Sequence, residues 1–185
     1  SSGKQGYAIA EAARDRGART ILVTTPTALP DPTGIEIARV ETVAQMRDAV
    51  LAACQQADVL IMAAAVSDYR PVVVAEHKIK KSESGNGLAI QLTQNDDFFL
   101  EVSDKVLKVG FAAESDDLLD NASKKLTANR LALIAANDIT SADSGFASDT
   151  NRVVLLDRDR GVTELGLLSK YDVGHHILDK VLQLL

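Results

Sequence analysis

Residues 58–71, with the sequence DVLIMAAAVSDYRP, decide how this chain folds. From Val59 to Met62 the run is apolar without polar alternation, which is typical of a strand buried on both faces of a parallel sheet. The small residues that follow let a ligand lie close against the backbone; they are Ala63, Ala64 and Ala65. Asp68 comes soon after, and ligands of open α/β sheets bind outside the carboxyl ends of the strands. The stretch predicts a site where a carboxylate holds a metal ion or a polar group of a nucleotide. The alternative is a buried strand followed by an ordinary polar loop.

The rest of the chain alternates strand and helix patterns around this stretch. Strand patterns cover residues 19–25, 35–40, 105–111 and 131–138, and helical patterns cover 7–14, 41–54, 116–129 and 170–185. Residues 151–157 and 162–167 flank Arg160-Gly161 and predict a final antiparallel hairpin. We therefore expect an α/β fold: a Rossmann-like, doubly wound, mostly parallel sheet with an antiparallel C-terminal hairpin.

Composition excludes several classes of protein. The 185 residues suffice for one α/β domain with a full core, and the net charge of -6 argues against nucleic acid as a partner. The lysines gather in two groups, which suits a small anionic substrate; they are Lys78, Lys80, Lys81, and Lys124, Lys125. With no signal peptide and no apolar run long enough to span a bilayer, we expect a cytoplasmic protein without a membrane partner.

The cysteine and histidines predict no metal centre. Cys54 is the single cysteine, which rules out an internal disulfide and a Cys-rich metal site, and its helical position indicates a small core residue. His175 and His176 lie in the closing helical pattern without a carboxylate cluster, so we expect surface residues.

The chain opens with SSGKQG, residues 1–6, directly before the first helical pattern. The serines are N-cap candidates, and Gly3 and Gly6 permit close backbone approach, so the helix start can bind an anion. A plain helix cap is the alternative, because the spacing is not that of a Walker A loop. A helix that opens at residue 4 without a strand before it also suggests that a preceding strand and turn are missing.

Residues 72–92 predict a β-hairpin arm. Its strands, 77–81 and 88–92, flank a polar, Gly-rich tip at 82–87, and alternation puts Lys78 and Lys80 on one face. Because a two-stranded arm is marginally stable alone, we expect it to lean on another subunit. The lysines either protect a solvated edge or reach a phosphate.

Two further strands end as residues 58–71 do. Residues 110–115 read GFAAES and residues 136–138 read AND, so small residues again precede polar ones. Three such endings at one edge of a sheet predict a ligand cleft. Residues 95–100 look like the start of a further helix, with acidic residues in its first turn.

Several stretches together resemble phosphopantothenoylcysteine synthetase, the second half of the bacterial bifunctional coenzyme A biosynthesis protein. They occur in the family's order and span nearly the whole chain: SSGKQGYAIA at 1–10, AAAVSDYRP at 63–71, KIKK at 78–81, GFAAE at 110–114, AND at 136–138 and GF at 145–146. The flavin-dependent decarboxylase half is absent from these residues, so the resemblance implies a fused or associated decarboxylase in the full-length protein.

The resemblance implies a single nucleotide-binding ligase domain over residues 1–185, active as a homodimer through the hairpin arm. The carboxylate of 4'-phosphopantothenate attacks the α-phosphate of CTP, which gives an acyl-cytidylate and pyrophosphate. The amine of cysteine then displaces CMP and forms the amide. Such a concentration of phosphate charge requires lysines and Mg²⁺ or another divalent cation.

The resemblance also implies residue roles. Asp68 corresponds to the aspartate beside the nucleotide and its cation, and Lys78 to the catalytic lysine that enters the neighbouring subunit's site. The remaining nucleotide and phosphate contacts implied are Met62, Ala63, Ala64, Asp97, Phe98, Phe99, Phe111, Lys125, Ser1 and Gly3.

Three positions depart from the family pattern. Asn95-Asp96-Asp97-Phe98 stands where the family has Asn-Pro-Asp-Ile, and Asn129 stands where it has a second lysine. The family's opening strand, and an asparagine that serves the acyl intermediate, would lie upstream of Ser1. These departures favour one alternative, a non-catalytic nucleotide-binding or regulatory domain. The expected topology leaves a second alternative open, an NAD(P)-dependent Rossmann-type reductase. The chain shows no GxGxxG turn, which disfavours the reductase.

Overall fold

The computed structural model describes residues 2–79, 88–95, 97–114, 117–138 and 148–185. The chain forms two compact units, one comprising Ser1–Ala65 with Phe98–Leu185 and the other Val66–Asp97. The first unit contains most of the expected domain. The second unit contains the residues of the expected arm, 72–92, together with flanking residues on both sides.

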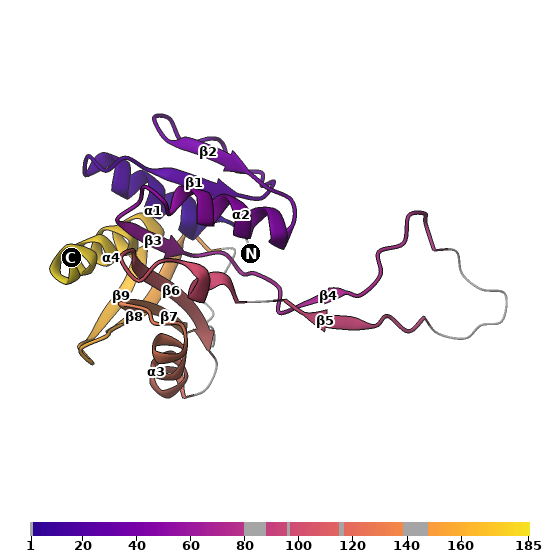
Figure 1. The fold of residues 1–185 in the computed structure, drawn as a ribbon. Coiled ribbons are helices and arrows are strands. Elements are labelled where there is room, and N and C mark those ends of the chain that lie inside the picture. Colours follow the sequence, from indigo (N-terminus) through magenta and orange to yellow (C-terminus); the bar gives the residue numbers. More distant parts are fainter. Residues whose placement is uncertain (1, 80–87, 96, 115–116, 139–147) are drawn as a thin grey trace. The chain divides into compact units, whose positions relative to one another are not determined.

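The first unit is built on a five-stranded sheet with the order β3-β6-β7-β8-β9 (Figure 1). Its strands are β3 (Val59–Met62), β6 (Leu107–Glu114), β7 (Leu133–Asp138), β8 (Thr150–Asp157) and β9 (Val162–Ser169). The first three run parallel, and β8 and β9 continue the sheet antiparallel. The mostly parallel α/β sheet and the antiparallel C-terminal hairpin are therefore confirmed.

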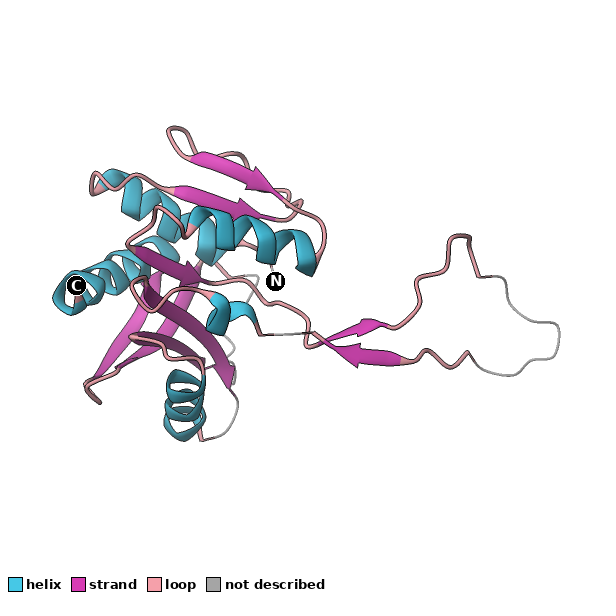
Figure 2. Ribbon diagram, in the orientation of Figure 1, coloured by secondary structure: helices cyan, strands magenta, loops and turns pink. Residues whose placement is uncertain are grey.

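Helices cover both faces of this sheet, as Figure 2 shows. Helices α1 (Lys4–Asp15) and α4 (Lys170–Leu184) bury Ile9, Val173 and Ile177 against one face. Helix α3 (Leu118–Ala128) buries Ala122 against the other. Apolar side chains at helical spacing thus fill both interfaces, as a doubly wound fold requires.

Helices α1 and α4 approach each other closely. A Cβ at Gly174 would lie 3.2 Å from the Cα of Ile9 and 3.3 Å from the Cβ of Ala12. Glycine at this position lets the two backbones meet, which fixes the start of α4 beside α1.

A second, two-stranded parallel sheet pairs β1 (Ile21–Thr24) with β2 (Glu36–Arg39). Helix α2 (Val43–Ala53) follows, and Thr42 caps it: its hydroxyl accepts from the Gln45 N–H, and the Gln45 side chain accepts from the Thr42 N–H. This capping box explains why the helix begins where the sequence predicts. Among the described residues, β3 has a strand partner on one side only, β6.

The second unit contains a short antiparallel pair, β4 (Tyr69–Pro71) with β5 (Leu92–Gln94). The predicted hairpin strands at 77–81 and 88–92 are wrong in their described parts. Residues 77–79 and 88–91 are not in strands, and pairing occurs nearer the base of the arm. Residues 80–81 and the predicted tip lie outside the described residues. Charged and exposed apolar side chains fit a two-stranded ribbon poorly unless a further surface covers them.

Smaller predictions also need correction. The predicted serine N-cap of α1 is wrong, since Gly3 occupies that position at φ +78° without a side-chain cap bond. Cys54 is half-buried at the end of α2 rather than in the core, and burial raises the pKa of its thiol. The segment after Asp97 forms a single 3-10 turn, η1 (Phe98–Glu101).

The histidines agree in part with expectation. His176 is exposed, but His175 is half-buried and packs edge-on against Tyr171. Within the described ranges no three metal-ligating side chains cluster. In the same part of the chain, no helix combines the length and apolar character needed to cross a bilayer.

Candidate functional site

The carboxyl ends of β3 and β6 form the shelf that the sequence predicts. Met62 pairs with Gly110, so Ala63 and Phe111 continue the two strands side by side. Both pack against the core beneath α1 and α4. Met62 is buried and Ala64 is exposed, so the shelf passes from core to solvent within three residues.

The start of α1 lies against this shelf. A Cβ at Gly6 would lie 3.8 Å from the Cβ of Ala63. Gly3, the N-cap, offers no side chain to the first-turn amides, which leaves backbone N–H groups at a positive helix end. Ser1 lies outside the described residues. The combination of small residues and helix amides suits a phosphate group.

Next to α1, a cavity of about 290 Å³ opens between the first turns of α1 and α4. Its lining includes Lys4, Tyr7, Asp149 and Lys170. Sequence reasoning missed Lys170 and Asp149. The signal available was a lysine at a helix start directly after a strand.

Asp68 and its neighbours belong to the second unit. The Asn95 N–H donates to the Asp68 carbonyl at 2.8 Å, and the Asn95 amide donates to the Ser67 carbonyl at 2.8 Å. Arg70 Nη1 donates to Asn95 Oδ1 at 2.8 Å. Asn95 therefore closes the base of this unit and leaves the Asp68 side chain exposed.

The exposed Asp68 suits a magnesium ion that comes with a nucleotide. Mg²⁺ binds through one or two carboxylates together with substrate phosphates and water. A single exposed carboxylate fits that donor set, whereas an all-protein cage would need more oxygen ligands. Lys78 and Asp97 lie in the same unit, and both are exposed.

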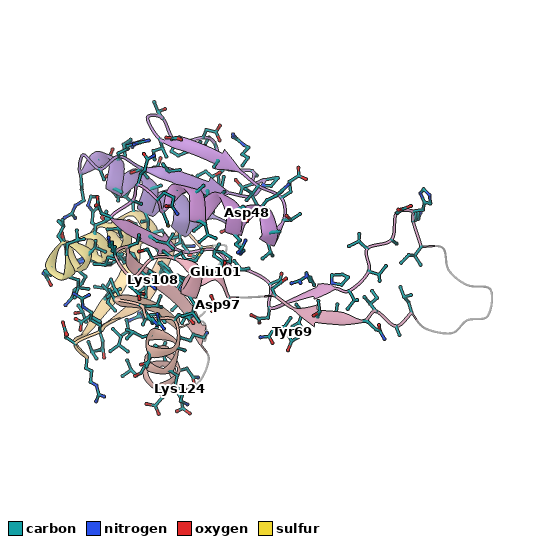
Figure 3. The ribbon with its side chains drawn as sticks, in the orientation of Figure 1. Asp48, Tyr69, Asp97, Glu101, Lys108 and Lys124 are labelled. Carbon is teal, nitrogen blue, oxygen red and sulfur yellow. The ribbon has the colours of Figure 1, made fainter. Side chains whose placement is uncertain are left out.

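Turn η1 is held from two sides. Arg47 Nε in α2 donates to Glu101 Oε1 at 2.8 Å, and its Nη2 also contacts Glu101. Lys108, 3% exposed in β6, places its Nζ 3.5 Å from the Phe99 carbonyl and 3.2 Å from Asp104 Oδ1. Figure 3 labels Glu101 and Lys108 on their two elements.

These cationic partners also lower the pKa values of two carboxyl groups at or near η1. The Arg47 guanidinium holds the pKa of Glu101 below its usual value, and Lys108 does the same for the pKa of Asp104. Sequence reasoning missed both cations, although a lysine inside the apolar strand LKVG is an available signal.

The predicted nucleotide residues in this region differ in exposure. Phe98 is 3% exposed, so its side chain belongs to the protein interior. Phe99 is half-buried and packs on the core beside α3. Lys125 is exposed in the last turn of α3, and Asn129 is the C-cap of that helix.

The structure therefore brings together part of the predicted set. Gly3, Met62, Ala63, Ala64 and Phe111 surround the carboxyl end of β3 or the start of α1 in the first unit. Phe99 and Lys125 lie in the same unit on the face opposite α1. The residues Asp68, Lys78 and Asp97 belong to the second unit and are described there alone.

Asn137, a residue outside the predicted set, has a buried side-chain oxygen that needs a hydrogen-bond donor. The Oδ1 of Asn137, near the carboxyl end of β7, is buried without a hydrogen-bond partner among the described residues. A buried acceptor of this kind is costly unless a donor reaches it.

Comparison with known proteins places these features in a family. The coenzyme A biosynthesis bifunctional protein CoaBC of Bacillus subtilis is 42% identical over 185 residues, covering 98% of this chain and 45% of its own length. The protein of the same name from Vibrio vulnificus is 38% identical and is covered over 46% of its length. This chain thus spans about half the length of these relatives.

A solved structure agrees with the fold. The crystal structure of the C-terminal domain of a coenzyme A biosynthesis bifunctional protein CoaBC matches with a TM-score of 0.81 at 38% identity. The match covers 98% of this chain and 82% of that one. The family model described as DNA/pantothenate metabolism flavoprotein C-terminal domain matches residues 1–185. The chain therefore belongs to the family of DNA/pantothenate metabolism flavoprotein C-terminal domains.

Proposed function

We propose that this chain is the synthetase part of a coenzyme A biosynthesis protein and joins cysteine to 4'-phosphopantothenate at the expense of CTP. The observation that carries the proposal is the 42% identity to a CoaBC protein across 98% of the chain. The remaining length of such relatives supports a second, flavin-dependent decarboxylase domain in the full-length protein.

The proposed reaction proceeds in two steps. A carboxylate oxygen of phosphopantothenate attacks the α-phosphorus of CTP, forming acyl-cytidylate and releasing pyrophosphate. The cysteine nitrogen then attacks the acyl carbon, CMP leaves with the carbon–oxygen electron pair, and the nitrogen loses a proton. Both steps concentrate negative charge, so cations and aligned backbone amides are the groups required.

The geometry of the first unit supports the placement of the phosphorylated acid. The amides at Gly3 suit its phosphate, and the small side chains of Gly6 and Ala63 leave room for its chain. Phe111 lies at the adjoining strand end, where the activated carboxylate would be protected from water.

The second unit supplies the charged groups of the proposal. Asp68 would hold the divalent cation bound to CTP, and that cation would neutralise the triphosphate. Lys78 would act in the cleft of a second copy of this chain, so the active form is a homodimer. Exposed apolar side chains of this unit support that assembly, because solvated monomers rarely expose such runs; they are Val72, Val73, Val74, Ile90 and Leu92.

The test uses the purified full-length protein with phosphopantothenate, cysteine, Mg²⁺ and CTP, ATP or NADPH. Pyrophosphate release and the mass of the amide product report the two steps. We expect CTP-dependent product, a fall of about 100-fold or more in the Lys78→Gln variant, and little change in Lys105→Gln, a matched exposed lysine. CTP binding without turnover would support the non-catalytic alternative, and a response to NADPH alone would support the reductase.

A further inference from the structure

A network of polar side chains holds the first two residues of α1. Lys4 Nζ donates to Asp149 Oδ1 at 2.6 Å. Gln5 Nε2 donates to the carbonyl oxygen of Lys170, the first residue of α4, at 2.9 Å. Asn151 Nδ2 in β8 donates to Gln5 Oε1 at 3.3 Å. The start of α1 is thus tied to two other elements of the same unit.

Lys170 lies at the centre of this network. Its side chain is 6% exposed and donates to the Ser148 carbonyl, and its backbone N–H donates to the Asp149 carbonyl at 3.0 Å. Burial lowers the pKa of the Lys170 ammonium, the nearby charge of Lys4 lowers it further, and Asp149 opposes both effects. An apolar side chain of the same length would fill the space without that cost, so packing alone does not account for a lysine here.

The network adds lateral bonds to the first turn of α1. Gly3 makes no side-chain cap bond, and its carbonyl accepts from the Tyr7 N–H at 3.1 Å. The same turn carries Gly6, which faces Ala63. The lateral bonds from β8 and α4 therefore act together with the close packing at Gly174 to hold the start of α1 beside the shelf.

We infer that Lys170 is a positioning residue for the phosphorylated acid. Its side chain holds the Ser148 carbonyl and its backbone N–H holds the Asp149 carbonyl. The Asp149 carboxylate accepts from Lys4, so the first turn of α1 stays at a fixed distance from Ala63. This inference rests on the proposed function for the identity of the substrate. It concerns the placement of the substrate phosphate at the first turn of α1.

A matched control exists on the same helix. Lys180 in α4 pairs with Asp157 at 3.6 Å, and its side chain is partly buried. Lys180→Met removes a lysine ion pair from α4 without touching α1. Lys170→Arg retains the charge and a donor for the Ser148 carbonyl.

The kinetic test compares KM values in the full-length protein. We expect Lys170→Met to raise KM for phosphopantothenate about 10- to 100-fold, the range for a displacement below 1 Å, with KM for CTP within about twofold. Lys170→Arg should recover most of the loss, and Lys180→Met should match the wild type. Equal changes in both KM values, or none, would overturn the inference.

A second readout does not depend on turnover. Amide hydrogen exchange of α1 peptides should quicken in Lys170→Met and remain unchanged in Lys180→Met and Lys170→Arg. If the wild type forms no product, the proposed function fails, and exchange alone decides the positioning role. Exchange in α1 that is the same in Lys170→Met and Lys180→Met would refute that role.

Discussion

Substitutions of Phe98 distinguish two roles for its side chain: packing in the core and direct contact with the nucleotide. Its side chain is 3% exposed. Truncating a buried phenylalanine to alanine costs about 3–5 kcal/mol, because transfer free energy is lost and a cavity remains. For a domain of this size, each kcal/mol lowers Tm by roughly 2–4 °C, so Phe98→Ala should lower Tm by about 6–20 °C.

Phe98→Leu keeps an apolar side chain and should cost only about 1–2 kcal/mol. Circular dichroism during heating measures the Tm of both variants, and initial rates measure KM for CTP. We expect KM for CTP in Phe98→Leu to stay within about twofold of wild type, since an interior side chain offers no surface to a base. A KM raised more than about tenfold, with an unchanged Tm, would refute this reasoning and assign the ring to the nucleotide.

Three further predictions concern packing, charge and pH. Gly174→Ala adds a Cβ 3.2 Å from the Cα of Ile9. Overpacking at this contact should cost about 1–3 kcal/mol, which outweighs the gain of about 1 kcal/mol in helix propensity. We therefore expect thermal unfolding to show a lower Tm. Lys4 holds the pKa of Asp149 below its usual value. The stabilisation from this pair is complete above the unfolded-state pKa and is lost as pH falls through the lower folded pKa. Asp149→Asn should therefore flatten the acid limb of a stability–pH curve, and an unchanged limb would contradict the assignment. Asn129→Lys should lower KM for CTP about fivefold, the effect of roughly 1 kcal/mol from one added charge pair; an unchanged KM would place the nucleotide elsewhere.

Much of the fold could be predicted because local patterns and tertiary structure agree. The apolar run of β7 is buried and Thr42 caps α2, as the sequence predicts. The prediction of a fully buried strand is wrong for β3, where only Met62 is buried and the other three residues are half-buried. The predicted serine cap failed because Gly3 adopts a left-handed conformation that the flanking sequence does not specify. The arm strands failed because alternation alone cannot supply the covering surface that a two-stranded ribbon needs.

The candidate site was less accessible to sequence reasoning. Small residues at strand ends predicted a shelf around Ala63, because that signal is local, and the structure places Gly6 of α1 beside Ala63. The roles of Lys108 and Lys170 depend on partners distant in sequence, such as Phe99 and Ser148, so no spacing rule reveals them. Phe98 was assigned by correspondence with a motif, which carries no information on burial.

The valine run of the second unit has a consequence for handling the protein. Val73 and Val74 expose 78% and 79% of their surface beside a short strand pair in which each strand, among the described residues, has one partner. Such a segment invites association, and dilution would leave it without cover. Proteolytic cutting of this segment should therefore slow as protein concentration rises, which gives a simple titration of self-association.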